Sequence, residues 1–120
     1  MTDPATTPTD RRKRVVRAVM AHRKDGDPVT FRADDPPEDA RVTYDDRLLE
    51  LAVSAAERDR LDAFLAEYPV FKVKQPETRK APEGTVFVSA IADPKHLADF
   101  VEDCFRQVYD RGEGYGLSVE

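Results

Sequence analysis

The chain has 120 residues, of which 40% are hydrophobic and 36% are charged, and its formal net charge is −5. This length fits one domain with a single core. No apolar run approaches the roughly 20 residues of a membrane-spanning helix. No apolar block follows the first basic residues, so we expect neither membrane attachment nor a signal peptide. The single cysteine excludes an internal disulfide and favours a cytoplasmic location.

The charged residues are strongly biased in kind. Asp outnumbers Glu by 15 to 9, and Arg outnumbers Lys by 13 to 6. A highly charged surface keeps a protein soluble in a salt-loaded cytoplasm. The composition therefore predicts a halophilic source.

The first 46 residues predict a helix and a short hairpin. We expect residues 1–9 to be a disordered tail and residues 10–46 to hold the helix, which ends near Lys24, and the hairpin. Seven basic residues and no acidic residue lie between Arg11 and Lys24, so the rest of the chain carries 12 basic and 24 acidic residues. The helix has an apolar stripe that predicts one buried face: Val15, Val16, Val19 and Met20. Short strands are expected at 29–32 and 41–44, with a tight turn at 45–46.

Residues 47–120 show the clearest pattern, which predicts strand, helix, strand, strand, helix and strand. Ser54 and Glu57 form a capping box before the first helix of this core. Asp93 is the expected N-cap of the second helix, with Pro94 at its first position. The strands are expected at 48–53, 70–74, 85–91 and 115–119. Both helices carry apolar stripes at helical spacing.

This order of elements predicts the α+β class, with a ferredoxin-like βαββαβ core over residues 47–120. The preceding hairpin conflicts with that arrangement, because the first core strand of a ferredoxin-like sheet already has two neighbours. Either the hairpin pairs at an outer edge, or the order of the strands departs from the ferredoxin-like one. Both alternatives stay open.

Candidate catalytic and metal-binding residues are few. Cys104 lies on the apolar stripe of the last helix, where a thiol is inert. His22 and His96 lie on charged helix faces without other ligands at metal-binding spacing, so we expect both to be solvated. Acidic pairs are abundant but fall on loops and polar faces, and no glycine-rich phosphate loop is present. We therefore expect a protein that is not an enzyme, with no catalytic, cofactor-binding or metal-binding residues and no cofactor.

Nucleic-acid binding is the alternative hypothesis. Its candidate residues are the basic ones of the first helix, two lysines of the second core strand and one aromatic residue of the third: Arg11, Arg12, Arg14, Arg17, Lys72, Lys74 and Phe87. The segment around Phe87 weakly matches an RNA-recognition strand. At molar salt the Debye length falls to about 3 Å, and phosphate binding weakens steeply. We therefore favour pairing of the arginines with the acidic body of the protein.

Several segments resemble a family of small haloarchaeal proteins without an assigned function: AHR (21–23), LAEYPVFKV (65–73), EGT (83–85), FVE (100–102), FRQVY (105–109) and GY (114–115). The resemblance covers most of the chain. This sequence departs from the family in having a shorter middle, around residues 34–41, and a more basic first helix. The resemblance implies a haloarchaeal origin and transfers no catalytic residue. The working hypothesis is a non-catalytic binding or regulatory module of a halophilic archaeon. Its partner is unknown, and pairing of two copies into a homodimer through a sheet edge or face is an open alternative.

Overall fold

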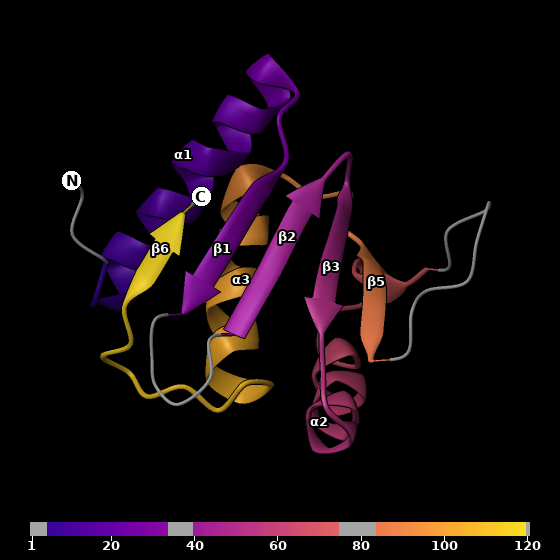
Figure 1. Cartoon of the computed structure of the whole chain (residues 1–120). Helices are drawn as coiled ribbons and strands as arrows, with labels where there is room; N and C mark the ends of the chain where they lie inside the picture. The colour runs from indigo at the N-terminus through magenta and orange to yellow at the C-terminus, as the bar shows by residue number, and fades with distance from the viewer. Residues whose placement is uncertain (1–4, 34–39, 75–83, 120) are drawn as a thin grey trace.

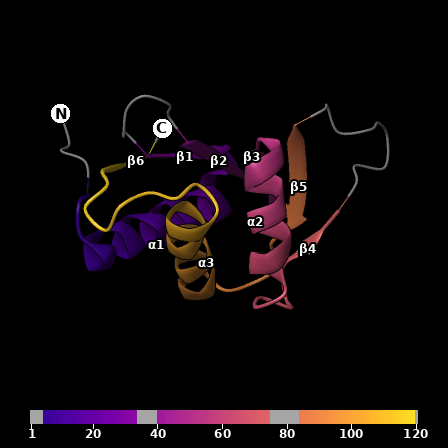
Figure 2. The ribbon, with the colours of Figure 1, turned by 90° about the horizontal axis from the view of Figure 1, so that it is seen from below.

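Three helices cover one face of an open antiparallel sheet in the computed structural model, which describes residues 5–33, 40–74 and 84–119 (Figures 1 and 2). The helices are α1 (Pro8–Asp25), α2 (Ala55–Leu65) and α3 (Pro94–Gln107). The strands are β1 (Val29–Ala33), β2 (Ala40–Asp45), β3 (Leu48–Ala52), β4 (Lys72–Val73), β5 (Thr85–Ser89) and β6 (Leu117–Val119). The α+β prediction is thus confirmed. No helix in the described ranges is both long enough and apolar enough to cross a membrane.

The order of the strands in the sheet is β4-β5-β3-β2-β1-β6. The part β4-β5-β3 has the neighbours expected for a ferredoxin-like core. In that core, β6 would lie directly beside β3. Here β2 and β1 lie between them, so the predicted four-stranded ferredoxin-like arrangement is not confirmed. The conflict posed by the hairpin is resolved by a change in the order of the strands.

The hairpin takes the place beside β3 because its connection to β3 is very short. Asp45 pairs with Leu48 across a two-residue turn, and four successive residues of β2 pair with β3. Closing so short a loop costs little entropy, whereas β6 is a three-residue strand far away in the chain. Because two antiparallel strands are inserted, β6 keeps the direction that it would have beside β3.

The structured part of the chain begins nearer the N-terminus than predicted. Ala5 is buried and forms a β-bridge with Leu117, and α1 begins at Pro8 after the N-cap Thr7. Residues 5–9 are therefore part of the structure, which corrects the expectation of a disordered tail for this stretch. Residues 1–4 lie outside the described residues. The stripe of α1 buries Val15 and Val19 as expected, but Met20 is 58% exposed.

The helices of the core begin as predicted. Ser54 and Glu57 form the complete capping box of α2, and Asp93 caps α3 by accepting from the His96 amide at 2.7 Å. Phe64 of α2 meets Phe100 of α3 with ring centroids 5.1 Å apart, so both helices pack on the same side of the sheet. Cys104 is completely buried, as predicted.

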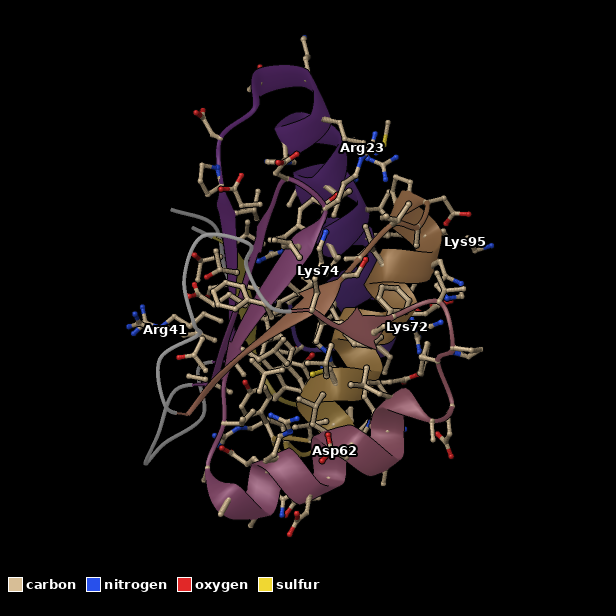
Figure 3. All side chains as sticks on the ribbon, turned by 90° about the vertical axis from the view of Figure 1, so that its right-hand side faces the viewer. Arg23, Arg41, Asp62, Lys72, Lys74 and Lys95 are labelled. Carbon is tan, nitrogen blue, oxygen red and sulfur yellow. The ribbon has the colours of Figure 1, made fainter. Side chains whose placement is uncertain are left out.

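The sheet has one covered and one open face. In β1, β2, β3 and β5, core-facing residues alternate with partly or fully exposed ones. Arg41 projects from the open face, on the side away from the helices (Figure 3). One face of an antiparallel sheet can face water in this way. The helices therefore confine the buried groups to the other face, where the candidate site lies.

Candidate ligand-binding cleft

A cleft of about 730 Å³ opens on the helical side of the molecule. Its walls are the C-terminal end of α1, the turn between β2 and β3, and the loop from β5 to α3, which meet at one end of the sheet (Figure 1). Cavities of roughly 300–1,000 Å³ are typical of small-molecule sites. The residues that matter for its chemistry are His22, Arg23, Tyr44, Asp46, Arg47 and Ile91.

The β2–β3 turn is the strained wall of the cleft. Asp46 and Arg47 have φ of +49° and +65°, the left-handed conformation that a two-residue hairpin of this kind requires. That conformation costs roughly 1–2 kcal/mol for a residue with a side chain. The surroundings hold it: the Asp46 amide donates to Nε2 of His22 at 3.2 Å, and the Ala90 amide donates to the Arg47 carbonyl at 2.8 Å.

His22 is a structural residue of the cleft floor, which corrects the prediction that it is solvated. Its side chain is buried, and its Nδ1 lies 2.6 Å from the carbonyl of Asp27. Because that carbonyl can only accept and the Asp46 amide can only donate, Nδ1 is the donor of the ring and Nε2 is its acceptor. Both ring nitrogens are therefore engaged with the backbone.

Tyr44 supplies the one polar group of the floor that is left without a partner. Its ring packs edge-on against His22 with centroids 5.0 Å apart, and its side chain is 1% exposed. Within the described part of the chain, the Tyr44 hydroxyl has no hydrogen-bond partner. The hydroxyl oxygen is not one of the described side-chain atoms that are buried without a partner, so it still reaches solvent. The floor of the cleft therefore presents a hydroxyl that is free to bind a ligand.

The rim of the cleft is polar on two sides and apolar on the third. Arg23 is fixed by a 2.6 Å hydrogen bond to the Ala92 carbonyl, whereas the Arg47 guanidinium has no partner among the described residues. The carboxylate of Asp93 is occupied as the cap of α3, whose positive N-terminal end faces this region. Ile91 is 63% exposed and forms an apolar lip.

Arg11, the first residue of the nucleic-acid hypothesis, lies in the core. Its Nε and Nη2 donate to the two carboxylate oxygens of Glu102 at 2.6 and 2.8 Å, and its Nη1 donates to the Tyr115 carbonyl at 2.9 Å. The Tyr115 hydroxyl donates to Glu102 at 2.9 Å, and its ring lies under the guanidinium, 4.0 Å away. This network is inaccessible to a nucleic acid.

The same network shifts the ionisation of its members. Burial by itself raises the pKa of Glu102, but the hydrogen bonds from Arg11 and Tyr115 outweigh burial and bring that pKa below its ordinary value. Burial likewise favours a lower pKa for Arg11, and the hydrogen bond and charge of Glu102 raise it instead. The pair is therefore charged over the whole physiological range.

The other arginines of the first helix are partly engaged as well. Arg12 forms an ion pair with Asp99 at 3.1 Å, and Arg14 donates to the Leu117 carbonyl at 3.4 Å. Arg17 is exposed. The expected pairing of helix arginines with the acidic body is thus seen directly for Arg11 and Arg12.

The remaining candidate residues lie elsewhere. Lys72 and Lys74 are exposed at the β4 edge of the sheet, whereas α1 flanks the β6 edge (Figures 1 and 3). Lysines on a short edge strand are a known protection against unwanted strand pairing. Phe87 is half-buried on the open face, directly opposite Glu50. The structure therefore does not bring the seven candidates together.

Cys104 and His96 behave differently from each other. Burial raises the pKa of the Cys104 thiol far above its ordinary value, which agrees with the inert thiol that the sequence predicts. His96 is exposed, as expected, and its ring stacks on Phe71 with centroids 5.3 Å apart. Among the described residues, no group of three potential metal ligands is found.

The sequence reasoning missed His22 and Tyr44, although one signal was present. His22 follows Val15 and Val19 at i+7 and i+3, so it continues the buried stripe of α1. Its charged neighbours along the chain concealed this position. No local pattern could show that the hydroxyl of Tyr44 would remain unpaired.

The fold and the cleft define a small α+β protein with a site of ligand size on the helical side of its sheet. The chain belongs to a family of unknown function, DUF7975, whose family model matches residues 1–120. No curated protein and no solved structure matches the chain.

Proposed function

We propose that this protein is a non-catalytic binding module that holds a small organic anion in the cleft. The observation that carries the proposal is the Tyr44 hydroxyl, which lines the cleft without a partner among the described residues, although the residue is only 1% exposed. The hydroxyl oxygen is not one of the described side-chain atoms that are buried without a partner, so water in the cleft can reach it. An acceptor atom of a bound ligand would take the place of that water.

The groups around Tyr44 favour an anion with a short apolar part. A carboxylate or phosphate oxygen can accept from the hydroxyl of Tyr44, and Arg47 supplies an uncommitted cation at the rim. The N-terminal end of α3 adds to the positive potential. Ile91 offers apolar surface to the body of the ligand. Asp46 is also on the rim and disfavours ligands with several negative charges.

The non-catalytic part of the proposal is supported by the state of His22. Both of its ring nitrogens are used by backbone groups, so neither is available to move a proton or to bind a metal. Cys104 is buried in the core, outside the cleft. The module therefore binds its ligand without changing it.

Titration calorimetry with two probes, benzoate and phenyl phosphate, tests the proposal, with benzamide as the uncharged control. We expect the anions to bind and benzamide not to bind. Tyr44→Phe and Arg47→Ala should each weaken binding about tenfold, which corresponds to about 1.4 kcal/mol. Arg41→Ala removes an arginine from the opposite face (Figure 3) and should leave binding unchanged. Equal binding by Tyr44→Phe and the unaltered chain would remove Tyr44 from the site.

Mass spectrometry of the recovered probes tests the non-catalytic part separately. We expect benzoate and phenyl phosphate to be recovered intact after prolonged incubation with the protein. Release of inorganic phosphate from phenyl phosphate, absent in the Tyr44→Phe variant, would show that the cleft performs chemistry.

We also propose that the module works in the cytoplasm of a halophilic archaeon. The support is the excess of Asp over Glu, 15 to 9, and the 12 basic against 24 acidic residues outside the segment from Arg11 to Lys24. Salt screens the repulsion among these acidic groups. The melting temperature should therefore rise between about 0.1 M and 2 M KCl, and a fall over this range would argue against a halophilic source.

Nucleic-acid binding has weaker support as a function. Its candidate residues are spread over the core, two edges and the open face, and Glu50 lies directly beside Phe87. A carboxylate at that position repels the phosphates that would follow a stacked base. A mobility assay with single-stranded RNA and duplex DNA at low and molar salt tests this alternative. Retention at low salt that is lost on Lys72→Ala/Lys74→Ala substitution would revive it.

A further inference from the structure

A second hollow lies on the outer side of the helical layer, between α1 and α3. It has a volume of about 440 Å³, and it is separate from the cleft at the end of α1. Its floor includes Val16 of α1 and Ala98 of α3. Its rim carries four basic residues: Arg12, Lys13, Arg17 and Lys95. We call this hollow the interhelical groove.

The groove is a basic surface on an acidic protein. Its one acidic residue, Asp99, is paired with Arg12. Lys13, Arg17 and Lys95 have no charged partner among the described residues. Figure 3 shows Lys95 extending from α3 into solvent. The three free cations surround apolar surface, so a partner must offer negative charge around an apolar stripe.

Met20 extends the apolar surface of the groove along α1. It follows Val16 by four residues and Arg17 by three, so it lies on the same face of the helix. Its side chain is 58% exposed, although Val15 and Val19 on the adjacent stripe are buried. Exposed methionine is favoured on surfaces that bind amphipathic helices, because the flexible thioether adapts to its partner.

We propose that the interhelical groove is a docking site for an acidic amphipathic helix of a partner protein. The apolar stripe of that helix lies on Val16, Ala98 and Met20, and its acidic side chains pair with Lys13, Arg17 and Lys95. From Thr9 to Met20 the groove face of α1 spans about three turns, which sets the length of the partner segment. This surface is independent of the ligand cleft.

A helical partner fits the groove better than a nucleic acid does. No aromatic residue is among the described residues that line the groove, so a base has nothing on which to stack there, and Asp99 is one of the lining residues. An apolar floor does not contribute to phosphate binding, which rests on the pairing of phosphates with lysine and arginine and therefore weakens with salt. It does contribute to helix docking, in which hydrophobic anchors recur at three- and four-residue spacing.

Fluorescence anisotropy with two labelled peptides tests the proposal on the full chain. The first is a peptide of about 14 residues with leucines at three- and four-residue spacing and glutamates on the flanking faces. The second has the same composition but scattered leucines. We expect the first to bind at least about tenfold more tightly at about 0.1 M KCl, and to retain measurable binding at about 1 M KCl.

Three variants, all altered at exposed residues, identify the surface. Lys13→Glu/Arg17→Glu should weaken binding of the amphipathic peptide at least about tenfold. Lys24→Glu/Lys74→Glu makes the same change in net charge outside the groove and should have little effect. Met20→Ser should weaken the binding that remains at high salt.

Two results would overturn the proposal. Equal affinity for the two peptides, or equal loss in the groove and control variants, would show non-specific attraction to a basic surface. Binding of duplex DNA or single-stranded RNA that is lost in Lys13→Glu/Arg17→Glu, without binding of the amphipathic peptide, would assign the groove to nucleic acid instead.

Discussion

Two buried polar sites lie between α1 and the rest of the protein, and they differ in completeness. Near the start of α1, the side-chain donors and acceptors of Arg11, Glu102 and Tyr115 satisfy one another. Near its end, His22 is equally well satisfied, but the neighbouring Tyr44 hydroxyl is not. Each site contains one tyrosine whose ring is buried. The first site is closed, and the second opens to solvent through the cleft.

This difference separates a structural role from a binding role. A fully paired buried network fixes how two helices meet, and nothing can be added to it. A polar group that the protein itself leaves without a partner can still form a hydrogen bond with another molecule. The two tyrosines therefore allow a matched test, in which the same chemical change should affect stability at one site and binding at the other.

The largest effect is expected from Arg11→Met. This substitution leaves the charge of Glu102 buried without its cationic partner, which typically costs about 3–5 kcal/mol. Equilibrium unfolding in denaturant measures the loss. The double variant Arg11→Met/Glu102→Leu replaces the ion pair by apolar groups and should recover much of the stability. A single variant as stable as the unaltered chain would contradict the structural role of the network.

The second-largest effect is expected from acid, which should weaken the buried network of Arg11, Glu102 and Tyr115 and so lower the free energy of unfolding. The pKa of Glu102 is lower in the folded protein than in the unfolded chain. Its contribution is therefore complete above the ordinary glutamate pKa of about 4.3, and it is lost as the pH falls through the lower folded-state value. Unfolding measured between about pH 6 and 3 should show this loss. The Glu102→Gln variant should show a smaller dependence on pH over the same interval.

Tyr115→Phe is expected to have an intermediate effect. It removes the hydroxyl that donates to the Glu102 carboxylate at 2.9 Å. A hydrogen bond to a charged group contributes about 1.5–3 kcal/mol, and the carboxylate cannot regain it from water. Denaturant unfolding should show a loss of this size. A change no larger than that of Tyr44→Phe would contradict the difference between the two sites.

The smallest effect on stability is expected from Tyr44→Phe. The hydroxyl that it removes has no partner in the described part of the chain, so the stability should change by less than about 0.5 kcal/mol or increase slightly. Thermal unfolding without ligand measures this change. A loss comparable to that of Tyr115→Phe would mean that the Tyr44 hydroxyl is already satisfied by water or by the protein.

The elements of the fold could be predicted because their signals are local. The capping box of Ser54 and Glu57, and Asp93 followed by Pro94, act on the backbone within a few residues. The order of the strands could not be predicted, because β2 and β6 compete for the same edge of β3. That competition depends on loop length and on the extent of pairing, which no single segment shows.

The candidate site was less predictable than the fold. The burial of Arg11 depends on Glu102 and Tyr115, which lie 91 and 104 residues further along the chain. A run of basic residues therefore gave no indication that one of them lies in the core. The free hydroxyl of Tyr44 depends on which groups α1 and the β5–α3 loop bring near it, so only three-dimensional placement reveals it.

The insertion of β1 and β2 between β3 and β6 also has a consequence for how the chain folds during synthesis. The outer edge of β1 cannot be paired before β6 has been synthesised, and the Arg11 side chain cannot be paired before Glu102 and Tyr115 have been synthesised. Both partners are synthesised long after the segments with which they pair. The helix α1 and strand β1 therefore cannot reach their final packing until residues 102–119 have left the ribosome, and such distant contacts slow folding.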